Sequence, residues 1–86
     1  MKELRWNLLK SERLKRTRGV SFEELTRAKL IDVTEHPKNP QQALMLFEYQ
    51  RYIWVVPFIE TDKEIFLKTL YPSRKFTRMY KGRKPL

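Results

Sequence analysis

Hydrophobic and polar positions change in short blocks along the chain, and these blocks predict small elements. Glu3–Trp6 alternates polar and apolar residues, which is typical of a short strand. Asn7 can cap a following helix, which is predicted to run to about Arg18. Gly19 then ends this helix, because glycine adopts a left-handed conformation without steric cost. The apolar stripe of the helix is thin and consists of Leu8, Leu9 and Leu14.

A capping box predicts the start of a second helix. Ser21 precedes Glu24 by three positions, so each side chain can satisfy a backbone N–H of the other residue. Val20 before the cap and Leu25 after it are placed for a hydrophobic staple. The pattern predicts a helix over about 22–30.

The middle of the chain is rich in β-forming residues and predicts three strands. Ile31–His36 alternates with period two, and 36–42 is a polar loop with two prolines. Ala43–Tyr49 and Tyr52–Ile59 follow, and a tight turn joins them. The second run is almost continuously apolar, as expected for a central strand that is buried on both faces.

Two prolines and a serine organise the last third of the chain. Pro57 has no N–H to donate, so it predicts a bulge or an unpaired site in its strand. Glu64–Leu70 is predicted as the last strand, which Pro72 ends. Ser73 can cap a short helix over 74–81, and 82–86 is a basic tail.

The order of these elements predicts one α+β domain over residues 1–86. Consecutive strands joined by short turns favour an antiparallel meander. We expect the two N-terminal helices to pack on one face of this sheet, with the short C-terminal helix following the last strand.

Composition excludes several classes of protein. The chain has 86 residues, no Cys and one His, so it offers no disulfide framework, no thiol nucleophile and no two-His metal site. No apolar run reaches the roughly 18 residues of a membrane-spanning helix, and the N-terminus has no signal-peptide pattern. We therefore expect a cytoplasmic protein that needs no metal or other cofactor and has no membrane partner.

The positive charge lies at the two ends of the chain. The formal net charge is +9. Residues 1–30 carry nine Lys/Arg and four Asp/Glu, whereas 31–66 carries three and six. Residues 67–86 carry seven cations and no acid. If the fold brings the ends together, one basic face results, and its natural partner is a polyanion such as RNA.

Five local strings carry a resemblance to a known family: Arg5-Trp6-Asn7, Arg18–Glu24, Tyr52–Phe58, Ile65–Thr69 and Pro72–Lys75. They resemble the BrnT-type toxins of bacterial type II toxin–antitoxin systems, which belong to the RelE/ParE-like group. The resemblance covers roughly residues 3–81, and the Gly-Val-Ser-Phe-Glu-Glu string is its most specific piece. Typical members have His before that Gly, whereas this chain has Arg18.

This resemblance implies a RelE-like fold and a translation-blocking toxin that cleaves mRNA, with or without the ribosome. It also implies a cognate antitoxin encoded beside it, often of ribbon-helix-helix type. Metal-free RNA cleavage needs a base for the ribose 2′-OH, cations around the phosphorane and an acid for the leaving 5′-oxygen. The candidate catalytic residues are Arg74, Tyr80, Lys68 and His36. The candidate RNA- or phosphate-binding residues are Lys75, Arg78, Lys81, Tyr71, Arg18 and Arg16.

Other interpretations of the same residues stay open. The chain can be a basic nucleic-acid-binding module without chemistry, or a ParE-like toxin that acts on a protein such as DNA gyrase. The cations can simply form a solvated surface, and His36 before Pro37 is typical of a structural loop residue. Trp6, Tyr52 and Phe76 can stack on bases or on the antitoxin, although the core is the favoured place for Trp6.

Overall fold

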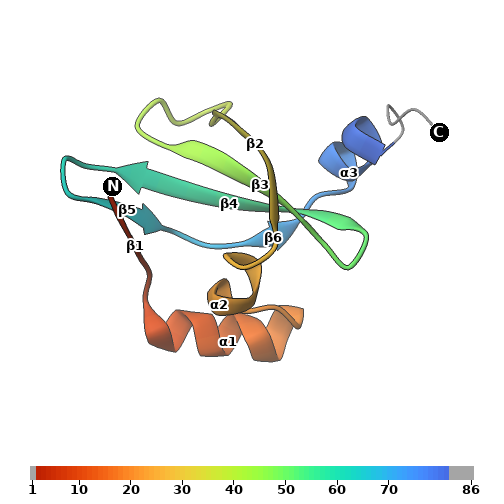
Figure 1. The fold of residues 1–86 in the computed structure, drawn as a ribbon, viewed down its shortest axis with the longest axis horizontal. Helices are drawn as coiled ribbons and strands as arrows, with labels where there is room; N and C mark the ends of the chain where they lie inside the picture. Colours follow the sequence, from red (N-terminus) through yellow and green to blue (C-terminus); the bar gives the residue numbers. More distant parts are fainter. Residues whose placement is uncertain (1, 82–86) are drawn as a thin grey trace.

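A six-stranded sheet forms the centre of the part of the chain that the computed structural model describes, residues 2–81 (Figure 1). Helices cover both faces of the sheet, which confirms the predicted α+β class. The elements are β1 (Glu3–Arg5), α1 (Leu8–Arg18), α2 (Phe22–Leu25), β2 (Lys29–Glu35), β3 (Ala43–Tyr49), β4 (Tyr52–Glu60), β5 (Glu64–Leu67), β6 (Tyr71–Pro72) and α3 (Arg74–Lys81).

The sheet is mixed, so the prediction of a purely antiparallel meander is wrong at one edge. The strand order is β1-β5-β4-β3-β2, and β6 pairs with β4 beside β5. β1 runs parallel to β5, with Leu4 opposite Ile65. This pair joins the two ends of the chain, and a pattern of neighbouring strands contains no signal for it.

Helix α1 begins and ends where its caps predict. The Asn7 side chain accepts a hydrogen bond from the Lys10 N–H at 2.9 Å, and Gly19 has a φ of 83°. The expected apolar stripe is wrong for two of its three leucines: Leu8 and Leu9 are 67% and 72% exposed, and only Leu14 is buried. A helix with so few buried side chains contributes little to the core.

Helix α2 begins at the predicted capping box but is shorter than predicted. The side chains of Ser21 and Glu24 each accept a backbone hydrogen bond from the other residue. The helix ends at Leu25, not near residue 30, because the chain already enters β2 at Lys29, opposite Glu48 of β3. Pairing with β3 therefore overrides the local helical pattern.

Two apolar clusters lie on opposite faces of the sheet. The larger one joins α1 and α2 to alternate residues of β3 and β4, with Phe22 and Leu25 fully buried. The smaller one consists of Leu44, Leu46, Ile53 and Val55, and α3 covers it with Phe76 and Tyr80. The predicted packing of both N-terminal helices on one face is confirmed.

A tight turn at Gln50 and Arg51 joins β3 to β4, as predicted. Both residues have a positive φ, 54° and 66°. Positive φ at both central residues is typical of a type I′ turn, whose twist matches that of the flanking strands. Type I′ turns prefer Asn and Gly, and this turn has neither. The hairpin keeps its register without a break from Tyr49–Tyr52 to Ala43–Phe58.

Candidate nucleic-acid interface

Pro57 determines the path of the chain between β5 and β6. Phe58 pairs with Leu67 and Val55 pairs with Tyr71, so two residues of β4 face the three residues 68–70. The predicted bulge is therefore present, but on the strand facing Pro57. The Pro57 carbonyl accepts a hydrogen bond from the Lys68 N–H at 2.8 Å, and its nitrogen has nothing to donate to residues 69–70. The extra residue splits the predicted strand Glu64–Leu70.

Arg18 connects the two basic ends of the chain. Its Nη1 donates a hydrogen bond to the Leu70 carbonyl, in the bulged segment just before β6. In the view of Figure 1, β6 lies between the end of α1 and α3. At this contact the two basic segments meet at one edge of the sheet, although α1 and α3 lie on its opposite faces.

Helix α3 is fixed to the sheet by hydrogen bonds at its first turn. Ser73 caps it as predicted, because its Oγ accepts from the Phe76 N–H at 3.0 Å. The Ser73 N–H donates to the Ile53 carbonyl at 2.9 Å, and the Ile53 N–H donates to Thr77 Oγ1 at 2.8 Å. The helix is thereby held in one position, with exposed cations on its outer side. These cations are Arg74, Lys75 and Arg78.

Lys68 and Tyr71 lie on the same face of the sheet as α3. The Nζ of Lys68 is 5.8 Å from the centre of the Phe66 ring, which is half-buried. Tyr71 pairs with Val55, a residue of the cluster under α3, and its side chain is exposed. Arg18 reaches the same edge from the opposite face.

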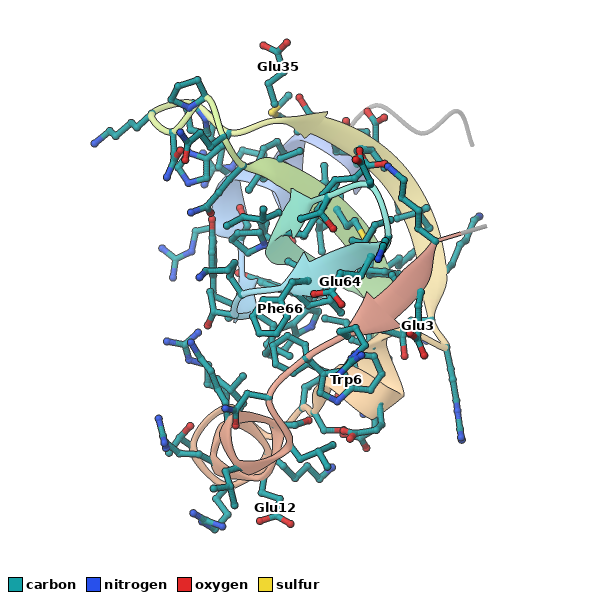
Figure 2. All side chains as sticks on the ribbon, turned by 90° about the vertical axis from the view of Figure 1, so that its left-hand side faces the viewer. Glu3, Trp6, Glu12, Glu35, Glu64 and Phe66 are labelled. Atoms are coloured by element: carbon teal, nitrogen blue, oxygen red, sulfur yellow. The ribbon has the colours of Figure 1, made fainter. Side chains whose placement is uncertain are left out.

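Six of the predicted site residues therefore form one surface that wraps round the sheet edge at β6. We call it the basic surface; it consists of Arg18, Lys68, Tyr71, Arg74, Lys75 and Arg78. Within residues 2–81, carboxylates form ion pairs with Lys2, Arg5 and Lys15, and none of these cations belongs to the basic surface. Figure 2 shows Glu12 and Glu35 projecting at opposite ends of the molecule, from α1 and from β2.

The hydroxyl of Tyr80 holds α3 to β2. It donates a hydrogen bond to Asp32 Oδ2 at 2.7 Å, and the ring packs near Phe76 with 6.3 Å between the ring centres. The Tyr80 hydroxyl and the Val33 N–H keep the pKa of Asp32 below its ordinary value, because both stabilise the carboxylate. This bond gives Tyr80 a structural task, and its role in proton transfer stays a prediction.

His36 lies apart from the basic surface, in the loop between β2 and β3. Its Nδ1 accepts hydrogen bonds from the N–H groups of Lys38 and Asn39, at 3.1 and 3.0 Å. Figure 1 shows this loop at the upper left of the view, α3 at the upper right, and the end of α1 that carries Arg18 at the bottom. The contacts of His36 are those of a residue that shapes a turn, and a catalytic role stays a prediction.

The remaining predicted site residues are not placed on the basic surface. Arg16 lines a cleft of about 250 Å³ between α1 and the start of α2. It is two positions from Arg18, so the two side chains point about 160° apart round the helix. Lys81 ends α3, but its side chain and the tail 82–86 lie outside the described residues.

A polar network at the α1–α2 junction was not predicted from the sequence. Glu23 accepts hydrogen bonds from the Ser11 hydroxyl at 2.6 Å and from Trp6 Nε1 at 3.1 Å. The buried Ser11 Oγ also accepts from the Phe22 N–H at 3.0 Å. The hydrogen bond from Ser11 is the main cause that lowers the pKa of Glu23. Figure 2 shows Trp6 between β1 and α1, close to this network.

The described residues show neither a metal-binding cluster nor a membrane-spanning helix. Within residues 2–81, no group of three or more His, Asp and Glu side chains is arranged to hold a metal ion. Over the same residues, no helix has the length and apolar character needed to span a membrane.

Comparison with known proteins adds no relative to this geometry. No protein-family model matches the chain, and no similar protein was found among curated proteins or among solved structures.

Proposed function

We propose that this chain is a toxin of the BrnT type, with a RelE-like fold, that cleaves RNA without a metal ion. The observation that carries the proposal is the contact of Arg18 with the Leu70 carbonyl, which connects both basic ends at one edge. A surface of cations that pair with no carboxylate of residues 2–81 favours a polyanion, because phosphates supply the missing negative charge.

The residues of the basic surface suit the charge that develops during cleavage. The 2′-oxygen of the ribose bonds to phosphorus, the bond to the 5′-oxygen breaks, and the products carry a 2′,3′-cyclic phosphate and a 5′-hydroxyl. Arg74 and Lys68 supply donors for the phosphorane oxygens, since cations stabilise charge that is larger in the transition state. The proton of the 2′-hydroxyl passes to a base, and the 5′-oxygen takes one from an acid.

A second candidate is RNA binding without cleavage. The two proton-transfer candidates are engaged elsewhere: the Tyr80 hydroxyl with Asp32, and His36 Nδ1 with two backbone N–H groups. This observation favours a surface that binds RNA without cleaving it. In both cases we propose an adjacent ribbon-helix-helix antitoxin whose acidic residues neutralise the basic surface.

The test is RNA cleavage in the presence of EDTA. The wild-type protein is expected to produce fragments with 2′,3′-cyclic phosphate ends, and Arg74→Ala is expected to lose them. Lys38→Ala, which removes an exposed cation from the β2–β3 loop, is the matched control and is expected to cleave normally. Binding without cleavage supports the second candidate. Intact RNA during growth arrest, without binding, contradicts both and favours a protein target such as gyrase.

A further inference from the structure

Tyr71 is the most exposed aromatic residue of the chain. The chain has two Trp, four Tyr and five Phe, all within residues 2–81, and the others are buried or half-buried. Tyr71 is 37% exposed on β6, at the edge of the sheet. Tyr71 is thus more open to a ligand than the other aromatic residues of the chain.

The backbone that carries Tyr71 is held on both sides. Leu70 before it is fully buried, and its carbonyl is bound by Arg18. Pro72 after it has a fixed φ, and Ser73 is bound to the Ile53 carbonyl. The ring therefore stands on a rigid support and needs little ordering when it binds.

Cations lie on both sides of this ring along the chain. Lys68 precedes it by three positions and Arg74 follows it by three, and both are exposed. Lys68 is itself above the ring of Phe66, a second and half-buried aromatic residue on the same face. Aromatic rings next to cations are what proteins use to bind single strands, because every base has a π-face and every linkage has a phosphate.

We infer that Tyr71 stacks on an unpaired base of single-stranded RNA, while Lys68 and Arg74 bind the neighbouring phosphates. This inference rests on the proposed function and narrows its substrate from RNA in general to unpaired RNA. A duplex does not fit, because its bases are stacked on one another and present no free face to a ring.

The other aromatic candidates for stacking are used inside the protein. Trp6 packs on Phe22 with 5.9 Å between ring centres, and its Nε1 donates to Glu23. Phe76 packs against the cluster under α3, and Tyr52 is half-buried against the larger cluster. The structure thus separates Tyr71 from the aromatic residues that build the core.

The experiment measures binding of a fluorescent 2′-O-methyl RNA strand, which has no 2′-hydroxyl to react and so is not cleaved. Tyr71→Leu is expected to bind the single strand at least about fivefold more weakly than wild type, and Tyr71→Phe within about twofold. The weak binding of a matched duplex is expected to be the same for all three proteins. Circular dichroism at the same temperature confirms that each variant is folded.

Each outcome bears on the inference separately from the proposed function. Equal binding of the single strand by Tyr71→Leu and wild type overturns the inference, even where wild type cleaves RNA in EDTA. An equal loss for single strand and duplex also overturns it. A specific loss in Tyr71→Leu supports it, even where wild type cleaves nothing. Tighter binding of single-stranded DNA than of RNA overturns the assignment to RNA.

Discussion

The α1–α2 junction and the basic surface use their charges in opposite ways. The junction consists of Trp6, Ser11, Lys15, Glu23 and Glu24. Each of its two carboxylates accepts two or more hydrogen bonds, and Glu24 also pairs with Lys15 at 2.9 Å. Every charge of the junction has an internal partner.

Within residues 2–81, no carboxylate forms an ion pair with a cation of the basic surface. Arg74, Lys75 and Arg78 are exposed on α3, and Lys68 lies over a ring. Cations without carboxylate partners add little to stability, and they are free to bind phosphates. The α1–α2 junction therefore stabilises the fold, whereas the basic surface is available for binding.

The largest expected effect is on the core under α1 and α2. Phe22→Ala removes a fully buried ring and is expected to lower the free energy of unfolding by about 3–5 kcal/mol. Phe76→Ala, under α3, removes a half-buried ring and is expected to lower it by less. Urea denaturation of both variants measures the difference. An equal or larger loss of unfolding free energy in Phe76→Ala would contradict the assignment of the main stabilising core to the face under α1 and α2.

The next effect is at the polar network of the junction. Ser11→Ala leaves the buried Phe22 N–H without its acceptor and removes a hydrogen bond from Glu23. The free energy of unfolding is expected to fall by about 1–3 kcal/mol, because an unsatisfied buried donor is costly. Thermal unfolding measures this, with exposed Thr17→Ala as the control. RNA binding by the folded variant is expected to stay unchanged. A loss of RNA binding without a loss of stability would contradict a purely structural role of the junction.

Removing the hydroxyl of Tyr80 distinguishes structure from catalysis. Tyr80→Phe is expected to lower stability by about 0.5–1.5 kcal/mol through loss of its bond to Asp32. Asp32→Asn is the partner variant, and a double-mutant cycle tests their coupling. A loss of RNA cleavage in Tyr80→Phe without any loss of stability supports proton transfer instead.

The junction also predicts a loss of stability in acid. The hydrogen bonds from Ser11 and Lys15 place the pKa values of Glu23 and Glu24 below their ordinary values in the folded state. Their contribution is therefore complete above the unfolded pKa of about 4.5 and is lost as the pH falls through the folded pKa. The melting temperature is expected to fall as the pH falls below about 4.5, and less steeply in Glu23→Gln. An identical slope in wild type and variant contradicts this cause.

The smallest expected effect on stability is at the basic surface. Lys75→Ala is expected to change the free energy of unfolding by less than about 0.5 kcal/mol, because its side chain is exposed. The same variant is expected to reduce the salt slope of RNA binding by about one. Lys38→Ala in the distant loop is the control. A lower stability of Lys75→Ala with an unchanged salt slope would indicate that Lys75 stabilises the fold and does not bind phosphate.

Much of the local structure is encoded in short signals. Asn7, Gly19, Ser21 and Ser73 each predicted a helix boundary that the structure has, because a cap acts through residues a few positions away. The parallel pairing of β1 with β5 has no such signal, since it joins residues from opposite ends of the chain. The early end of α2 reflects pairing of β2 with β3, which is also a non-local interaction.

The site was predictable in its composition but not in its geometry. The absence of acidic residues after residue 66 made Lys68, Tyr71, Arg74 and their neighbours candidate site residues. The contact of Arg18 with Leu70 lies in the bulged segment opposite Pro57, and spacing in one strand does not reveal which strand bulges. The separation of His36 and Arg16 from the basic surface likewise follows from the fold.

The central claim is that one basic surface, built from both ends of the chain, binds RNA. Amide chemical shifts of the ¹⁵N-labelled protein, recorded while the 2′-O-methyl single strand is added, test it most directly. The largest shifts are expected at residues 68–78 and at Arg18, at the end of α1. Shifts confined to the 36–42 loop or to the α1–α2 cleft, or no shifts at all, would contradict the claim.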